Sequence, residues 1–152
     1  MNILFVCTGN TCRSPMAELY FNRLMVLKKA PHTAASAGLS ACSGCPISQH
    51  SFEVMQTEGI DASAFRSSAL TRYALEQADR IICMTRSHVQ SLLSVCPEYR
   101  HKTHTLSEWS GGSDVPDPFG GDLACYRKTF EKMRTALEIL AEDICSQGEN
   151  DQ

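Results

Sequence analysis

Residues 3–6 of this chain form an unbroken apolar run, and a polar loop that contains glycine follows directly. Such a run is typical of a parallel strand that is buried on both faces of a sheet. The pattern predicts strands at 2–6, 33–37, 80–84 and 102–106, and helices from 14 onward and at 48–58, 71–77, 86–95 and 123–144. Strands that alternate with helices in this way indicate an α/β fold with a parallel sheet.

The composition is that of one globular domain, and residues 1–152 are predicted to form it. Apolar residues make up 43% of the chain and charged residues 20%, which excludes a disordered protein. The net charge is −3 and there is no basic stripe, so we expect no nucleic-acid partner. No apolar run approaches the roughly 20 residues of a membrane span, so no membrane association is expected.

The eight cysteines are expected to be thiols in a reducing compartment. The N-terminus lacks the basic region and the cleavage site of a signal peptide, which predicts a cytoplasmic protein. The pair Cys42 and Cys45 has no second pair to complete a zinc site, so these two are interpreted as surface thiols and no metal is predicted.

The position of Cys7 indicates a catalytic role, because it follows the first strand and Arg13 comes six residues later, at the start of a helix. None of the other seven cysteines has an arginine at this spacing. The intervening residues can curl into a cradle of inward-pointing N–H groups, and such a nest at a helix N-terminus binds a tetrahedral anion. The residues predicted to form this phosphate site are Thr8, Gly9, Asn10, Thr11, Cys12, Arg13 and Ser14.

The residue types in this loop suit phosphate chemistry. The positive potential of the cradle favours the thiolate form of Cys7, and Arg13 can hold two phosphate oxygens in a bidentate fork. Gly9 and Asn10 tolerate positive φ angles. Ser14 is expected to cap the helix, to donate its hydroxyl to the thiolate, or to do both.

The loop at 110–121 is expected at the same edge of the sheet, because it follows the last predicted strand. Its Asp117 lies between two prolines and can protonate the group that a thiolate displaces from phosphorus. Phe119 is predicted to form a wall of the pocket.

These motifs resemble those of the low-molecular-weight protein-tyrosine phosphatase family over nearly the whole chain. The segments that carry the resemblance are Cys7-Thr-Gly-Asn-Thr-Cys-Arg-Ser-Pro-Met-Ala-Glu18, Ser36-Ala37-Gly38, Ala78-Asp79 and Asp117-Pro118. It implies a three-layer, doubly wound sheet of four parallel strands and no cofactor. It also implies that Cys7 is the nucleophile, Arg13 the phosphate clamp and Asp117 the general acid.

The resemblance further implies that Asn10, Ser14 and Ser36 form hydrogen bonds that support the cradle. The family often has a histidine where Phe65 stands, and in the family it helps to brace the cradle asparagine, so the support of Asn10 stays open. Cys12 is interpreted in two ways: it captures oxidised Cys7 as a disulfide, or it is a small core residue.

Two details resemble the bacterial protein-arginine phosphatases within this family: Thr11 in the cradle, and Phe119 followed by two glycines. A threonine leaves polar room beside the phosphate for a guanidinium group, which Asp117 can pair with and protonate. We therefore predict a monomeric protein phosphatase that hydrolyses phosphoarginine through a phosphocysteine. Its partners would be phosphorylated proteins, with phosphate as product and competitive ligand. The resemblance then implies that it opposes a protein-arginine kinase in bacterial stress response.

Three alternatives remain at this stage. The first is a protein-tyrosine phosphatase with the same nucleophile. The second is a thioredoxin-coupled arsenate reductase, which needs two relay cysteines, whereas Cys83 has no partner thiol in the segment 87–95. The third is a phosphate-binding module without catalysis, which the presence of Cys7, Arg13 and Asp117 disfavours.

Overall fold

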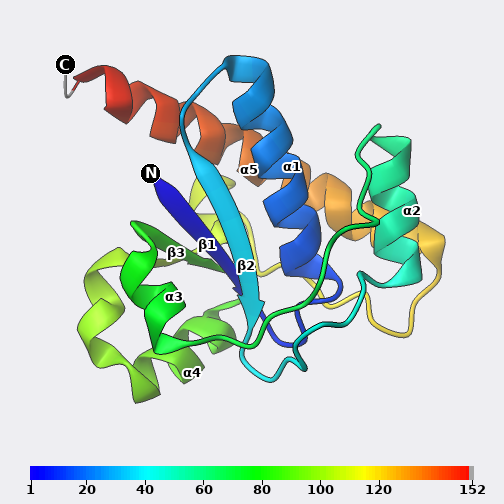
Figure 1. The fold of residues 1–152 in the computed structure, drawn as a ribbon, viewed down its shortest axis with the longest axis horizontal. Helices are drawn as coiled ribbons and strands as arrows, with labels where there is room; N and C mark the ends of the chain where they lie inside the picture. The colour runs from blue at the N-terminus through cyan, green and yellow to red at the C-terminus, as the bar shows by residue number, and fades with distance from the viewer. Residues whose placement is uncertain (151–152) are drawn as a thin grey trace.

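The computed structural model describes residues 1–150, except for the side chain of Glu149. Four parallel strands form one sheet in the order β2-β1-β3-β4. The strands are β1 (Asn2–Cys7), β2 (Thr33–Gly38), β3 (Arg80–Cys83) and β4 (Thr103–Thr105). Helices α1 (Arg13–Lys28), α2 (Gln49–Thr57) and α5 (Leu123–Asn150) cover one face, and α3 (Arg72–Gln77) and α4 (Arg86–Val95) cover the other (Figure 1). The predicted three-layer, doubly wound α/β fold is confirmed.

Strand β1 lies in the middle of the sheet, and its side chains alternate between two apolar cores. Ile3, Phe5 and Cys7 pack on the side of α1 and α5, whereas Leu4 and Val6 pack on the side of α3 and α4. This two-sided burial explains why the strand is apolar without alternation. The same pleat sends the side chain of Cys7 to the face that α1 covers.

The start of α1 differs from the prediction. The helix begins at Arg13, and Cys12 is its N-cap residue without a side-chain cap. Ser14 therefore lies inside the first turn, and the prediction that it caps the helix is wrong. Its hydroxyl is engaged by the side chains of Cys7 and Asn10 instead.

Other boundaries also differ from those predicted, most of them by one residue. The edge strand is only Thr103–Thr105, because short 3-10 helices at Pro97–Lys102 and Leu106–Trp109 flank it. Helix α5 continues past its apolar stripe to Asn150, and Gln147 there bonds Arg80 and Asp143. Within residues 1–150, no helix is both long enough and apolar enough to cross a membrane.

Candidate active site

The loop of residues 8–12 joins β1 to α1 at the carboxyl edge of the sheet. Its reversal depends on Asn10, which has a φ of 55°. Gly9 is not in the left-handed region, so the prediction of positive φ holds for Asn10 alone. At the end of β2, a Cβ on Gly38 would lie 2.6 Å from the carbonyl oxygen of Thr8 and 3.0 Å from the backbone nitrogen of Asn10. Glycine at this position lets β2 support the loop at close range.

The backbone of the loop turns its carbonyl groups toward neighbouring segments. The amides of residues 39, 40 and 48 donate to the carbonyl groups of Cys7, Thr8 and Thr11, each at 2.9 Å. Among the hydrogen bonds of residues 1–150, none has an amide of residues 9–12 as its donor. Free amides at the N-terminus of a helix can donate hydrogen bonds to an anion.

The thiol of Cys7 is 3% exposed at the floor of the loop, and its Sγ lies 2.8 Å from Ser14 Oγ. Asn10 Nδ2 donates to Ser14 Oγ at 2.8 Å. When Cys7 is a thiolate, its sulfur can only accept, so the Ser14 hydroxyl is then the donor of this hydrogen bond. A hydrogen bond to the thiolate stabilises the charged form of Cys7.

The side chain of Asn10 is completely buried and fully bonded. Its second Nδ2 hydrogen goes to Ser36 Oγ at 2.9 Å, and its Oδ1 accepts from the backbone amide of Ser68 at 2.8 Å. Phe65, which stands where the family often has a histidine, is a buried core residue. Ser14, Ser36 and the Ser68 backbone therefore hold Asn10 without a histidine.

This network continues to Glu18 on α1, because Ser36 Oγ donates to Glu18 Oε1 at 3.4 Å. Burial raises the pKa of the Glu18 carboxyl from its ordinary value of 4.5 to about 7, although the bonds from Ser36 oppose this shift. A carboxyl group with a raised pKa binds its proton more tightly in the folded chain than in the unfolded chain.

We expect the contribution of Glu18 to the stability of the protein to fall as pH rises from about 4.5 to about 7. In that range the folded state retains a proton that the unfolded state has lost, so unfolding releases a proton and higher pH favours it. Glu18→Gln keeps the acceptor for Ser36 and removes the titration. The melting temperature of the variant, relative to that of the wild type, should therefore rise between pH 4 and pH 8. A difference that is constant with pH would contradict this assignment.

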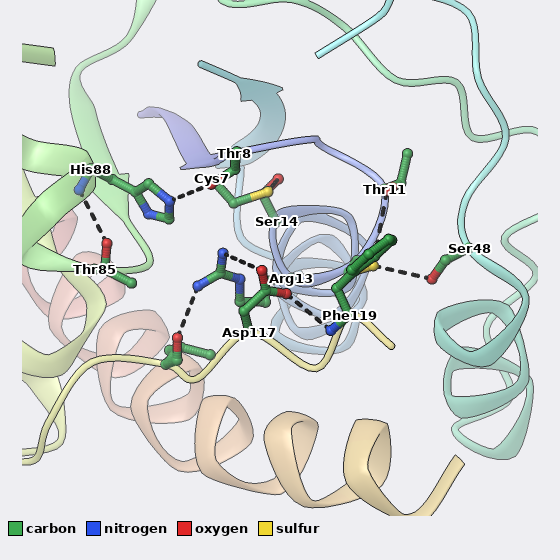
Figure 2. A network of polar contacts seen from close by, with 12 residues as sticks. Cys7, Thr8, Thr11, Arg13, Ser14, Ser48, Thr85, His88, Asp117 and Phe119 are labelled. Carbon is green, nitrogen blue, oxygen red and sulfur yellow. Dashed lines mark hydrogen bonds and ion pairs between the residues drawn. The ribbon is translucent and has the colours of Figure 1, made fainter. Parts of the chain in front are cut away.

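The guanidinium of Arg13 lies over the loop and is fixed from the opposite segment. Arg13 is 5% exposed, and its Nη1 donates to the carbonyl group of Val115 at 3.0 Å. Its Nη2 lies 3.7 Å from Asp117 Oδ2 (Figure 2). The amide of Val115 in turn donates to the carbonyl group of Met84, just after β3. The loop at 110–121 is therefore tied to both the sheet and Arg13, as the topology predicts.

Asp117 and Phe119 form the outer side of the site. Asp117 Oδ1 accepts from the backbone amide of Phe119 at 3.0 Å, which orients the carboxylate. The Phe119 side chain is 83% exposed. A cavity of about 270 Å³ lies between this segment and the loop, lined by Cys7, Thr8, Gly9, Thr11, Cys12, Arg13, Asp117 and Phe119. A buried thiol, a guanidinium and a carboxyl group thus meet at one small opening.

The sequence matches a known protein family. The family model described as low molecular weight phosphotyrosine protein phosphatase matches residues 2–150. The chain belongs to this family.

Some relatives of this phosphatase are named protein-arginine-phosphatase and others protein-tyrosine-phosphatase. A protein-arginine-phosphatase of Bacillus subtilis is 39% identical over 146 residues, which cover 95% of this chain and 97% of the relative. A low molecular weight protein-tyrosine-phosphatase, PtpB of Staphylococcus haemolyticus, is 38% identical over 138 residues, which cover 88% and 92%. The fold matches a solved structure of the arginine phosphatase YwlE with a TM-score of 0.91, 37% identity and 95% coverage of each chain. That structure is a cysteine-to-serine mutant whose active-site serine is phosphorylated.

The phosphatase has one polar residue beside its loop that the sequence analysis missed. His88 lies in the first turn of α4, and its Nε2 is 2.9 Å from Thr8 Oγ1. The two residues are separated by 80 positions, so no local pattern predicts their contact. The available signal was Thr85, an N-cap residue after β3 whose helix must start at the carboxyl edge of the sheet.

Cys12 belongs to the apolar core of this phosphatase and also lines the cavity that Cys7 lines. Its Sγ lies 3.4 Å from Tyr126 Oη and 3.5 Å from Ser48 Oγ, within the core beneath α1. None of the eight cysteines, all of which lie within residues 1–150, forms a disulfide in the structure. The core interpretation of Cys12 therefore describes this state, and a disulfide with Cys7 requires its side chain to leave Tyr126 and Ser48.

Proposed function

We propose that this phosphatase hydrolyses phosphoarginine in proteins through a phosphocysteine at Cys7. The observation that carries the proposal is the cavity of about 270 Å³ in which Cys7, Arg13, Asp117 and Thr11 meet. The relative named protein-arginine-phosphatase supports the substrate. A single domain over residues 1–152 would carry the activity.

In the first step, the Cys7 thiolate attacks phosphorus in line with the departing nitrogen. The S–P bond forms, the P–N bond breaks, and the electron pair of that bond goes to the guanidino nitrogen. Asp117, in its acid form, gives its proton to this nitrogen. Arg13 and the free amides of residues 9–12 hold the three equatorial oxygens as charge spreads over them.

In the second step, Asp117 takes a proton from water while the water oxygen attacks phosphorus. The S–P bond breaks, its electron pair returns to sulfur as the thiolate, and phosphate leaves. The hydroxyl of Ser14, 2.8 Å from the sulfur, stabilises the thiolate that each cycle regenerates. The cradle and Arg13 supply the positive charge, so the scheme uses only side chains and backbone of this chain.

Thr11 at the edge of the cavity is the proposed determinant of the arginine preference. Its side chain is partly exposed, and within residues 1–150 the one polar contact of its Oγ1 is a long one, 3.9 Å to Cys12 Sγ, so the hydroxyl can face an incoming group. Isoleucine at this position would remove the hydroxyl and place a larger apolar side chain beside the polar guanidinium. A flat aromatic leaving group tolerates that change better.

We expect Thr11→Ile to lower kcat/KM on a phosphoarginine peptide by about tenfold or more, relative to a matched phosphotyrosine peptide; tenfold is about 1.4 kcal/mol in transition-state binding. Initial rates on both peptides, for wild type and variant, measure this change in selectivity. Thr11→Ser is the matched control, because it keeps the hydroxyl and should keep the preference. Equal losses on both peptides would show that Thr11 does not select the substrate.

The tyrosine-directed alternative keeps the same nucleophile and is supported by the relative named PtpB. The same pair of peptides decides between the two substrates. The arsenate reductase alternative is disfavoured by Cys83, which is fully buried in β3. Burial and the neighbouring Cys7 raise the pKa of its thiol to about 12, so it is not available as a relay thiolate at neutral pH.

The proposal also covers the location, the oligomeric state and the regulation of the enzyme. We place the enzyme in the cytoplasm as a monomer that acts on phosphorylated proteins in stress response, with phosphate as product and competitive ligand. Under oxidation, a Cys7–Cys12 disulfide would protect the nucleophile. Peptide mapping after mild peroxide treatment tests this pairing, and Cys12→Ser should then lose recovery of activity by thiols.

A further inference from the structure

His88 is a buried histidine with only half of its hydrogen-bonding capacity used. It is 7% exposed, and the α4 N-cap Thr85 fixes its backbone by accepting from the His88 amide at 3.1 Å. Its Nε2 meets Thr8 Oγ1 at 2.9 Å (Figure 2). Its Nδ1 is buried, and no described residue offers it a partner. An unpaired buried nitrogen restricts which protonation state the ring can adopt.

The imidazole of His88 is neutral at pH 7. Burial lowers its pKa from 6.5 to about 4, and the positive charge of Arg13 acts in the same direction. The carboxylates of Asp114 and Asp117 oppose this shift but do not outweigh it. A neutral imidazole carries a single N–H, on either Nδ1 or Nε2.

The surroundings favour the hydrogen on Nε2. With the hydrogen on Nδ1, a buried donor would have no acceptor, and orphaned buried N–H groups are rarer than under-used acceptors. With the hydrogen on Nε2, the ring donates to Thr8 Oγ1 and leaves only a lone pair unpaired. The hydroxyl hydrogen of Thr8 is then not used by His88.

Thr8 stands in the wall of the same cavity as Cys7, Arg13 and Asp117. Apart from His88, Thr8 Oγ1 has no hydrogen-bond partner in the described part of the chain. We infer that His88 is a positioning residue that donates to Thr8 Oγ1 and so directs the Thr8 hydroxyl into the cradle, where it binds an oxygen of the phosphoryl group. This inference rests on the proposed phosphatase activity and adds one donor, Thr8, to the amides and Arg13.

The test uses para-nitrophenyl phosphate, so that it does not depend on the arginine preference. Thr8→Val and His88→Leu are each expected to lower kcat/KM by about tenfold to a hundredfold, the range for one hydrogen bond to a charged group. The double variant should be no slower than either single variant, because both changes remove the same donor. Thr8→Ser, which keeps the hydroxyl, and His88→Gln, which can offer an N–H near Nε2, should restore most of the rate.

Inorganic phosphate is the second probe, and its inhibition constant or calorimetric affinity should weaken in Thr8→Val and His88→Leu alike. Losses that add up in the double variant would assign His88 a purely structural role and overturn the inference. So would a normal affinity for phosphate in His88→Leu, or a failure of His88→Gln to recover activity while its melting temperature matches the wild type. If the wild type turned over no phosphate compound, the proposed function would fail, and the phosphate affinities would still decide the role of His88.

Discussion

Replacing Cys7 by serine is expected to abolish turnover, with a loss in kcat of roughly a millionfold, as for other enzymes that lose their nucleophile. A serine hydroxyl remains protonated at neutral pH, and the bond from Ser14 at 2.8 Å cannot convert it to an alkoxide. The fold should persist, because the substitution is nearly isosteric at a position that both β1 and α1 support. The measurement is steady-state turnover with circular dichroism as a check of folding.

Cys42→Ser is the matched control for this prediction. Cys42 is an exposed thiol outside the cavity, so its replacement should leave kcat unchanged. If Cys7→Ser retained near-normal turnover while remaining folded, a different group would be the nucleophile and the mechanism above would be wrong.

Asp117→Asn should lower kcat on phosphoarginine peptides by roughly a hundredfold to ten-thousandfold, the usual contribution of a general acid. Asparagine can still accept from the Phe119 amide, so the turn that holds the side chain should remain. The lost contact with Arg13, at 3.7 Å to an exposed carboxylate, contributes little to stability. The affinity for phosphate should therefore change little while the rate falls.

Leaving-group dependence separates an acid from a structural residue in Asp117→Asn. The loss should shrink on para-nitrophenyl phosphate, whose leaving group needs little protonation, and remain large on phosphoarginine. Asp122→Asn serves as control, because the Asp122 side chain accepts from the Cys125 amide and asparagine can do the same. An equal loss of kcat on both substrates would show that Asp117 is not the general acid.

The loop from Cys7 to Arg13 could be predicted from sequence because its position depends on neighbours in the chain. A buried strand, a short polar loop and a helix define the cradle locally, and the parallel sheet then brings Asp117 to the same edge. The details that were wrong depend on one or two torsion angles. Asn10 alone takes the positive φ, and α1 begins at Arg13, which moves Ser14 from the cap to the thiol.

The contacts that could not be predicted join segments that are distant in the chain. Thr8 follows β1 and His88 follows β3, and these neighbouring strands bring the two side chains together. Ser68 supports Asn10 through its backbone amide and not through its side chain. Phe65 shows the same limit, since the sequence reveals the missing family histidine but not the three hydrogen bonds that hold Asn10 without it. A single sequence shows residue types, whereas these contacts depend on three-dimensional packing.

The most direct test of the central claim is the kcat/KM of the wild-type enzyme on a phosphoarginine peptide and a matched phosphotyrosine peptide, with Cys7→Ser as the blank. The account predicts a preference for phosphoarginine of about tenfold or more, or about 1.4 kcal/mol in transition-state binding. A preference for phosphotyrosine would keep the Cys7 chemistry and contradict the arginine specificity assigned to Thr11 and Asp117.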